Sequence, residues 1–456
     1  MPESIQSLLV ETFPEISDVS ADTLKEARAD KSGQRASSLP LAVLSPRTVE
    51  EVQAIVRFAA DHRLPVVPRG GASGLAGGSI AHAGEIVVST SALNQILEIS
   101  KEDRLATVEA GVINDTLNSA AEAHGLWFAP DPASRAWSTV GGNIATNAGG
   151  LMCAKYGVTR ESVLSVDVVL ANGSLVTFGH RSVKGVTGLD LAQLMIGSEG
   201  TLGIIVRATV KLLPKDSHPT WTISALFGDI DSASAACQAV ISEGHSPSVL
   251  ELIDDRALPL IENHLGTPPS APGTVLVIAQ TDGSDSPARA KEITEIFAAS
   301  SGKTETQPEG ESAEALLALR RAMHPAMEAN GKVLIEDVAV PRSNMREMFR
   351  RIRQIESDFG VEIPTVAHAG DGNLHPNFIY QGSEVPSNIW DAAGALFHSA
   401  LELGGTLSGE HGVGLLKKRW LRDELGDDVW NLQRKIKAVF DPEGILNPGK
   451  VFDSQP

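Results

Sequence analysis

The sequence contains only two cysteines, Cys153 and Cys237, among its 456 residues. Two cysteines cannot form the disulfide framework of a small secreted protein. No run of about 18 apolar residues occurs, which excludes a membrane-spanning helix. The acidic start of the chain also lacks the basic segment of a secretory signal. We therefore expect a cytoplasmic protein with no transmembrane segment.

The sequence also has fewer basic than acidic residues. Lysine and arginine number 38 against 57 acidic residues, which gives a formal net charge of −19. A surface of this sign repels phosphate backbones, so we expect no nucleic acid as a partner. Hydrophobic residues make up 42% of the chain and charged residues 21%, a composition typical of a globular protein with two or three domains.

Apolar patterns in the first part of the chain predict a β-α-β start. Residues 41–44 and 64–68 read as strands, and the helix between them has Ser45 as a candidate cap. The dipeptide Asn172-Gly173 predicts a hairpin within residues 163–178.

A polar stretch with two prolines, residues 214–219, predicts a domain boundary. Beyond it, strand and helix patterns alternate in two β-α-β-like units that reach residue 299. A charged loop is expected from there to Ser312. This alternation favours an antiparallel sheet backed by helices.

Glycine, by contrast, is abundant and gathers in three stretches, residues 68–79, 138–150 and 195–205. None has the spacing of a Rossmann turn or a P-loop. Consecutive backbone N–H groups without side chains can converge on an oxyanion such as a pyrophosphate. One such stretch could be a mobile surface loop, but three together predict a binding site for an extended ligand.

Two histidine-containing motifs lie in the second half of the chain. In His368-Ala-Gly-Asp-Gly-Asn-Leu-His375, the Asp-Gly pair predicts a turn that brings both imidazoles to one side. The second motif is Gly409-Glu410-His411-Gly412. Two histidines and a carboxylate are a common ligand set for a catalytic divalent metal.

The order of these five stretches resembles the FAD-dependent D-2-hydroxy-acid dehydrogenases, which have the FAD fold of the vanillyl-alcohol-oxidase type. The group includes D-lactate dehydrogenases, the FAD subunit of glycolate oxidase and D-2-hydroxyglutarate dehydrogenase. The resemblance runs from about Leu41 to Phe452. It implies an α+β fold, with a two-part FAD-binding domain and a ferredoxin-like antiparallel-sheet substrate domain.

The resemblance also implies a function for each domain. Residues 1–215, with a helical lead-in, would bind FAD. Residues 216–456 would form the substrate domain with the metal site, and a segment from about 405 to 456 would return to the FAD domain.

The same resemblance implies that FAD is held by the glycine stretches and by a few residues near them. These residues are Pro68, Arg69, Gly70, Gly71, Ala72, Ser73, Gly74, Leu75, Gly77, Gly78, Ser79, Pro130, Asp131, Thr139, Val140, Gly141, Gly142, Asn143, Ala145, Thr146, Asn147, Ala148, Glu199, Gly203, Ile204, Ile205 and Asn447.

We expect the FAD to be bound without a covalent link. Relatives with covalent flavin often carry a histidine in the first glycine loop, and this chain has Ala72 there. Cys153 is an alternative attachment point, but we expect it to be a buried small hydrophobe.

The resemblance further implies that His368, His375 and Glu410 bind a divalent metal. Zinc fits this mixture of nitrogen and oxygen ligands, with manganese or iron as alternatives. His411 would be the base that takes the proton from the substrate hydroxyl.

Two other residues would contact the substrate. Arg320 would pair with its carboxylate, because a guanidinium matches a carboxylate in two hydrogen bonds. We expect the neighbouring Arg321 to be a surface charge. Asn377 would hydrogen-bond the substrate.

The choice of substrate depends on two departures from the hydroxyglutarate-type relatives. Those relatives carry a lysine where this chain has Ile335 and a threonine where it has His324. The missing cation favours D-lactate or glycolate over a five-carbon diacid, with D-2-hydroxyglutarate as the alternative.

Other readings stay open from the sequence alone. The chain could be a non-catalytic FAD-binding subunit of a larger complex, or a group-transfer enzyme of the alkyl-glycerone-phosphate-synthase type. The sequence does not identify the electron acceptor, which could be a quinone, an electron-transfer protein or oxygen. A homodimer is compatible with the sequence.

Overall fold

The computed structural model describes residues 4–453 and divides the chain into two compact units. Within the described residues, the first unit comprises residues 4–149, 158–215 and 410–453, and the second comprises residues 150–157 and 216–409. The acidic start on which we base the absence of a signal lies partly outside the described residues. No helix among residues 4–453 is long and apolar enough to cross a membrane.

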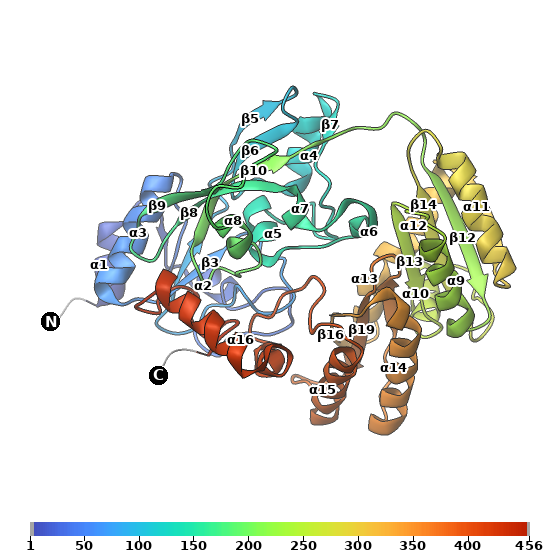
Figure 1. The fold of residues 1–456 in the computed structure, drawn as a ribbon. Helices are drawn as coiled ribbons and strands as arrows, with labels where there is room; N and C mark the ends of the chain where they lie inside the picture. The colour runs from blue at the N-terminus through green and yellow to red at the C-terminus, as the bar shows by residue number, and fades with distance from the viewer. Residues whose placement is uncertain (1–3, 454–456) are drawn as a thin grey trace. The chain divides into compact units, whose positions relative to one another are not determined.

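The first unit contains two main sheets and a short third one (Figure 1). A four-stranded sheet has the order β1-β2-β4-β3, and a five-stranded antiparallel sheet has the order β5-β6-β10-β8-β9. The strands are β1 Ser17–Asp18, β2 Ala42–Leu44, β3 Val66–Arg69, β4 Ile86–Ser89, β5 Ile96–Ser100, β6 Leu105–Glu109, β7 Leu126–Trp127, β8 Val163–Val169, β9 Leu175–Gly179, β10 Ile204–Lys211 and β11 Leu213–Pro214, the last pairing with β7.

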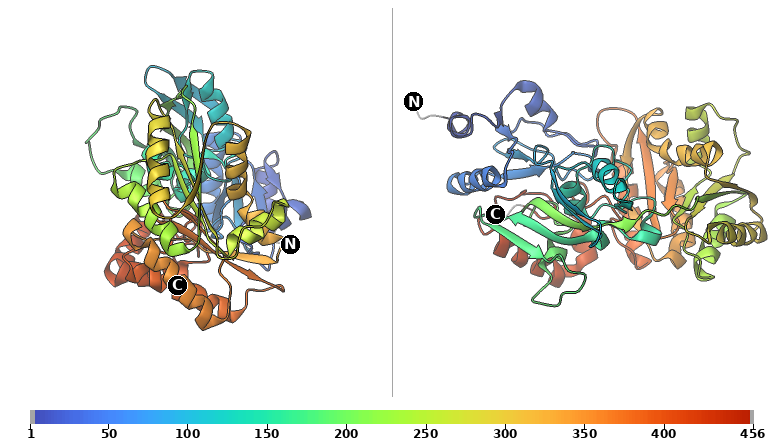
Figure 2. Two further views of the ribbon diagram at one scale, coloured as in Figure 1. Left: turned by 90° about the vertical axis from the view of Figure 1, so that its right-hand side faces the viewer. Right: turned by 90° about the horizontal axis from the view of Figure 1, so that it is seen from above.

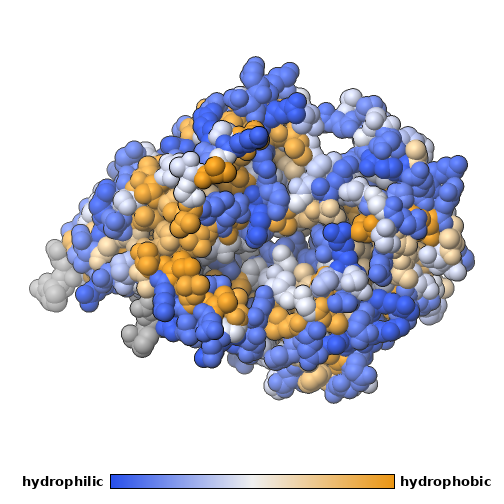
Figure 3. All heavy atoms as spheres, viewed as in Figure 1, coloured by the Kyte–Doolittle hydropathy of each residue, from blue (hydrophilic) through white to orange (hydrophobic). Residues whose placement is uncertain are grey.

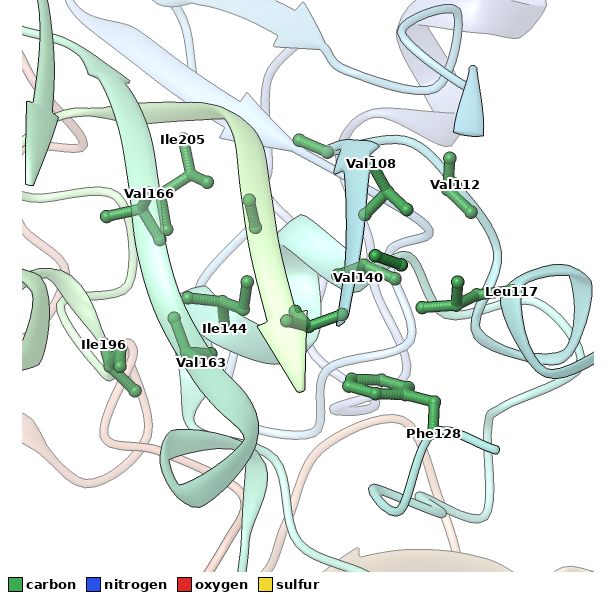
Figure 4. Packing of buried hydrophobic residues seen from close by; sticks show 14 of the residues in the cluster. Val108, Val112, Leu117, Phe128, Val140, Ile144, Val163, Val166, Ile196 and Ile205 are labelled. Carbon is green, nitrogen blue, oxygen red and sulfur yellow. The ribbon is translucent and has the colours of Figure 1, made fainter. Parts of the chain in front are cut away.

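Helices cover these sheets, and the buried apolar side chains form two large cores and one smaller cluster. The helices are α1 Ile5–Thr12, α2 Ala21–Glu26, α3 Val49–His62, α4 Asn114–Glu122, α5 Val140–Thr146, α7 Thr159–Ser162, α8 Leu191–Met195 and α16 Lys418–Phe440. One face of α3, with Val52, Ile55 and Val56, is buried against the four-stranded sheet. Figure 4 shows the second core, in which Val140 and Ile144 of α5 meet Val166 of β8.

The predicted β-α-β start and the Asn172-Gly173 hairpin are present, but the helix cap differs from our expectation. Helix α3 is capped by Thr48, whose side chain accepts from the backbone of Glu51 while the Glu51 carboxylate accepts from the backbone of Thr48. This reciprocal capping box satisfies two helix-end donors, whereas Ser45 lies outside the helix. The prediction of Ser45 as the cap was wrong.

Apolar side chains reach the surface of the first unit near the end of β9. Val183, Val186 and Leu189, in the segment that follows β9, are 90%, 99% and 86% exposed, and Val439 at the end of α16 is 79% exposed. Phe178 of β9 packs edge-to-face on Phe440 of α16, with ring centroids 6.4 Å apart. Figure 3 shows apolar residues gathered over this part of the unit, which is typical of a surface that contacts another molecule.

The second unit is built on one antiparallel sheet, in which the order is β15-β12-β14-β13-β18-β19-β16 and β17 also pairs with β19. Its strands are β12 Trp221–Phe227, β13 Val249–Ile253, β14 Val275–Thr281, β15 Lys303–Pro308, β16 Lys332–Ile335, β17 Val338–Ala339, β18 Thr365–His368 and β19 Asn373–Tyr380. The predicted antiparallel sheet is confirmed. The expected charged loop, however, contains the edge strand β15.

Helices pack on both faces of this sheet (Figure 2). They are α9 Ile230–Ser242, α10 Ala257–Leu265, α11 Ser286–Ala299, α12 Glu311–Arg321, α13 Met323–Glu328, α14 Met345–Phe359 and α15 Ser387–Glu402. Alternate residues of β13 and β14 bury against α10 and α13 in one apolar cluster, which includes Ile253, Ile278 and Met323. The remaining residues of these strands face the other helix layer, so the sheet is covered on both sides.

A short segment from the first half of the chain, residues 150–157, belongs to the second unit, although we assigned it to the FAD domain. It contains helix α6, Cys153–Tyr156, which packs on β13. Lys155 and Tyr156 both donate hydrogen bonds to Asp282, just after β14. Burial and this contact raise the pKa of Tyr156. These bonds to a single carboxylate explain why the segment joins the second unit.

Candidate functional site

The first two glycine stretches lie against each other in the first unit. The loop that begins at the end of β3 passes so close to residues 137–142 that side chains would not fit. A Cβ on Gly71 would lie 2.3 Å from the carbonyl oxygen of Trp137, and one on Gly70 would lie 2.5 Å from Oγ1 of Thr139. The glycines are therefore required for this packing.

The third stretch and the C-terminal segment come to the same place. The side-chain amide of Asn447 donates to the carbonyl oxygens of Gly78 and Glu199, at 2.9 and 2.7 Å. The carboxylate of Glu199 accepts from the backbone N–H groups of Val413 and Gly414. These four segments, far apart in the sequence, thus form one backbone-rich site in the first unit.

Three buried polar atoms of this site have no hydrogen-bond partner within residues 4–453. They are Oγ of Ser138, Nδ2 of Asn143 and Oδ1 of Asn447, on residues that are 1%, 3% and 1% exposed. A buried donor or acceptor without a partner costs about 1–3 kcal/mol. All three lie in or beside the segments expected to hold FAD, so the site fits a polar cofactor that supplies the missing partners.

In other residues that we expect to bind FAD, the side chain hydrogen-bonds to the protein backbone or packs in an apolar core. Thr139 caps α5 by accepting from Gly142, and Asn147 ends α5 and accepts from Arg160. Arg69 donates to the carbonyl oxygen of Ser79. Val140, Ile204 and Ile205 have side chains in the apolar cores, so only their backbones are available to a ligand.

Cys153 is not the buried hydrophobe that we expected. Its side chain is partly exposed, and its Sγ accepts from the backbone N–H of Gly150 at 3.0 Å. The thiol therefore contacts the backbone just before helix α6 in the second unit. The other cysteine, Cys237, is fully buried in α9, and burial raises its pKa to about 12.

In the second unit, the predicted histidine hairpin is present. Strands β18 and β19 pair antiparallel, with His368 opposite Asn373 and His375 opposite Val366. The turn between them uses Gly372 at a φ of 89°, a conformation that favours glycine. The rings of His368 and His375 are both buried, and their centroids lie 5.0 Å apart.

A buried carboxylate holds the first histidine. Glu251 of β13 lies directly opposite His368 of β18 in the sheet. Its Oε1 accepts from Nδ1 of His368 at 2.6 Å, and its Oε2 accepts from Nε of Arg320 at 2.5 Å. Burial acts to raise the pKa of Glu251, but the charges and hydrogen bonds of His368 and Arg320 hold it below its usual value.

The two candidate arginines on α12 have different surroundings. The side chain of Arg320 is 13% exposed and points to Glu251. Arg321 is 45% exposed and forms an ion pair with Glu314, about two turns earlier on the same helix. The structure thus places Arg320 beside the histidine hairpin and Arg321 on the surface.

Close backbone packing fixes the position of Gly409, the residue before Glu410. Gly409 passes so close to the hairpin that a Cβ there would lie 2.2 Å from Nδ2 of Asn373 and 3.1 Å from Oδ1 of Asp337. Glu410 follows by a single peptide bond. His368 and His375 both lie on this hairpin, and Glu410 is the third residue of the expected ligand set.

Asp337 lies beside His375, and His411 lies beside Glu410. Asp337 is fully buried, accepts from Asn373 and Ser408, and has Oδ1 3.9 Å from Nδ1 of His375. In the chain next to Glu410, His411 is 10% exposed and has Nε2 3.8 Å from Oε1 of Glu410.

Asn377 lies two residues beyond His375 on β19 and is fully buried. Its side-chain amide donates to the carbonyl oxygens of Pro364 and His375. Its Oδ1 has no hydrogen-bond partner in the described part of the chain. Any contact with substrate would therefore be made by this oxygen as an acceptor. Its direct neighbour across the sheet is Ile335 of β16.

Sequence reasoning missed Glu251 and Asp337. The available signal was weak but real: Glu251 is the one charged residue in the strand Val249-Leu-Glu-Leu-Ile253, and Asp337 comes two residues after an apolar strand. A single carboxylate within a buried strand must have partners, because an unpaired buried charge is very costly.

Family models match both units of the chain. The model described as "FAD binding domain" matches residues 40–179, and the model described as "FAD linked oxidases, C-terminal domain" matches residues 218–451.

Curated relatives match nearly the whole chain. The glycolate oxidase subunit GlcD of Bacillus subtilis is 39% identical, over 91% of this chain and 89% of its own length. The D-lactate dehydrogenase of Archaeoglobus fulgidus is 34% identical, over 98% of both chains. The D-2-hydroxyglutarate dehydrogenase of Stutzerimonas stutzeri is 32% identical, over 91% of both chains.

Solved structures show the same fold at low identity. The 4-ethylphenol oxidase of Gulosibacter chungangensis matches with a TM-score of 0.76 at 18% identity, over 98% of this chain and 96% of its own. An alkyldihydroxyacetonephosphate synthase matches with a TM-score of 0.75 at 20% identity, over 98% of this chain and 84% of its own. The predicted fold class, an FAD-binding α+β fold of the vanillyl-alcohol-oxidase type, is confirmed.

The orphaned amide of Asn143 leads to a first prediction. Asn143→Ala should weaken FAD binding by about 2- to 10-fold, the effect of one neutral hydrogen bond, without lowering the melting temperature of the FAD-free protein. FAD affinity is measured by fluorescence titration of the apoprotein. As a control, Asn118 has both ends of its amide bonded to Phe128, so Asn118→Ala should lower stability and leave FAD affinity unchanged. The opposite pattern would contradict the assignment.

The pKa of Glu199 predicts that the stability of the protein depends on pH. Burial raises the pKa of Glu199 to about 7 from its ordinary value of 4.5, although the N–H groups of Val413 and Gly414 partly oppose the shift. The folded state then binds a proton that the unfolded state releases in this range, so the stabilisation is complete below pH 4.5 and is lost as the pH rises through about 7.

The melting temperature of the wild type should therefore fall more steeply from about pH 5 to pH 8 than that of Glu199→Gln, which cannot ionise. Both proteins are compared in the same buffers by differential scanning calorimetry. Parallel curves would show that Glu199 does not titrate in this range.

Proposed function

Because the chain belongs to the FAD-linked oxidases and has D-lactate dehydrogenases and glycolate oxidase subunits among its relatives, we propose that it oxidises a small D-2-hydroxy acid, D-lactate or glycolate, to the 2-keto acid. The observation that carries the proposal lies in the second unit: two buried histidines beside a buried glutamate–arginine pair. This combination supplies metal ligands and a carboxylate receptor in one place.

The oxidation removes a hydride from C2 of the substrate and a proton from its hydroxyl group. FAD, when bound by the glycine-rich site, supplies the hydride acceptor, and we propose that it is held without a covalent link because Ala72 occupies the position of the linking histidine. His368, His375 and Glu410 would hold a divalent metal, for which zinc is our first choice and manganese or iron the alternatives. Such a cation lowers the pKa of a hydroxyl group close to it.

The other residues have roles that follow from their chemistry. Arg320 would bind the substrate carboxylate through its guanidinium. His411 would accept the hydroxyl proton as the general base, a contribution typically worth about 10²–10⁴-fold in rate. Asn377 would orient the substrate by accepting a hydrogen bond at Oδ1. Water is excluded from the histidine rings, which are almost fully buried.

The sheet favours a monocarboxylate over a diacid. A residue directly opposite Asn377 points to the same face of the sheet, and that residue is Ile335. A five-carbon diacid needs a second cation, which this position does not provide. The candidate ligands, base and arginine are all present, which supports an enzyme rather than a non-catalytic FAD-binding subunit.

Anaerobic flavin reduction tests the substrate. D-lactate or glycolate should bleach the flavin absorbance at least about tenfold faster than D-2-hydroxyglutarate, because the second carboxylate would be desolvated without a partner. L-lactate should be inert. Faster bleaching by D-2-hydroxyglutarate would establish the alternative substrate, and no bleaching by any of these acids would refute the enzymatic proposal.

Elemental analysis tests the metal. Wild-type protein should contain about one divalent metal per chain, since one three-ligand set is present, and His375→Ala should contain far less. His264 is an exposed histidine at the end of α10 in the same unit, so His264→Ala is the matched control and should retain the metal. Equal metal in all three proteins would remove His375 from the ligand set.

A further inference from the structure

Glu251 contacts both a candidate metal ligand and the candidate substrate arginine. It lies in the middle of β13 and has no exposed surface. One carboxylate oxygen accepts from Nδ1 of His368 at 2.6 Å and the other from Nε of Arg320 at 2.5 Å. Each oxygen therefore has its own partner.

Strand register and helix position determine where Glu251 and its two partners lie. Glu251 and His368 are direct partners in the β13–β18 ladder, so their side chains emerge on the same face of the sheet. Arg320 reaches the same carboxylate from the last turn of α12. Removing a carboxylate from water is costly, and a buried ion pair often contributes little to stability relative to apolar residues. A positioning role gives a reason for such a residue here.

We propose that Glu251 is a positioning residue that fixes the metal-binding imidazole of His368 and the carboxylate-binding guanidinium of Arg320 relative to each other. This inference rests on the proposed function of the site. It adds a residue that neither contacts the substrate nor binds the metal, yet sets the spacing between the groups that do.

The effect on His368 follows from hydrogen-bond chemistry. An ionised carboxylate only accepts hydrogen bonds, so Nδ1 of His368 must carry the proton that it shares with Glu251. The coordinating atom is then Nε2, and the ring cannot rotate without losing the hydrogen bond. Carboxylate partners of this kind orient metal-binding histidines, and their loss typically costs about 10- to 100-fold in metal affinity.

The effect on Arg320 concerns the direction of its guanidinium. Because Nε donates to Glu251, the terminal Nη groups remain as the donors for a substrate carboxylate, and the planar group is fixed in one orientation. In a 2-hydroxy acid the carboxylate and the hydroxyl are on adjacent carbons. Because one glutamate fixes both the imidazole of His368 and the guanidinium of Arg320, the site favours 2-hydroxy acids over acids whose hydroxyl is one carbon further away.

The experiment compares wild type with Glu251→Gln in the FAD-loaded protein. The metal is removed with a chelator, and zinc affinity is measured by calorimetric titration, which does not depend on activity. Glu251→Gln should bind zinc about 10- to 100-fold more weakly and show a KM for D-lactate raised about tenfold or more. Glu262, a buried glutamate of α10 that accepts from Ser270, provides the control Glu262→Gln, for which both values should stay at the wild-type level.

A double-variant comparison separates positioning from a general loss of structure. If Glu251 acts on the substrate through Arg320, then adding Glu251→Gln to Arg320→Lys should raise KM little further, while zinc affinity should still fall. If Glu251→Gln fails to fold, Glu251→Asp keeps the charge on a shorter side chain that cannot reach both partners, and it should show smaller losses in the same two measurements.

The outcomes distinguish this inference from the proposed function. Unchanged zinc affinity and KM in Glu251→Gln, in a wild type that binds zinc and oxidises D-lactate, would overturn the positioning role alone. Additive KM effects in the double variant would overturn its action through Arg320. A wild type that neither binds zinc nor oxidises a 2-hydroxy acid would overturn both.

Discussion

The second unit depends on the burial of one carboxylate between a histidine and an arginine. Glu251 has no exposed surface, and its two hydrogen bonds connect strand β13, strand β18 and helix α12. A buried charge is tolerated only when every part of it is paired. The antiparallel register between β13 and β18 and the position of Arg320 on α12 satisfy this condition. The two histidines owe their places to the same sheet.

In the first unit, the corresponding constraint is close backbone approach. Gly70 and Gly71 leave no room for side chains next to residues 137–139, and Asn447 connects Gly78 to Glu199. The result is a site made mainly of backbone, with buried polar atoms on Ser138, Asn143 and Asn447 that lack partners within the described residues. The energetic penalty of those atoms is removed when a polar cofactor binds, so holo protein should be favoured over apo protein.

Much of this could be predicted from the sequence, because the relevant signals are local. The Asp371-Gly372 turn predicts the histidine hairpin, and the Asn172-Gly173 turn predicts the β8–β9 pair. The helix cap at Thr48 was missed because Ser45 offered a competing local signal. Strand β15 was missed because an exposed edge strand such as Lys303–Pro308 has a polar composition close to that of a loop.

The remaining errors concern contacts between segments far apart in the chain. Residues 150–157 join the second unit through Asp282, more than a hundred residues later. Glu251 meets its partners at a separation of 117 residues for His368 and 69 for Arg320. Local periodicity carries no information about such pairs, since they are set by strand order. The local signal for Glu251 was a single acidic residue within an otherwise apolar strand.

In the reaction that we propose, this FAD-linked oxidase removes a hydride from C2 of a D-2-hydroxy acid with the help of a metal held by His368, His375 and Glu410. The most direct measurement is the anaerobic rate of flavin reduction by D-lactate and by D-lactate deuterated at C2, before and after removal of the metal. We expect slower reduction by the deuterated substrate, a large loss of rate on chelation, and recovery when zinc or manganese is restored. A rate that is unaffected by deuterium and by chelation would contradict this proposal.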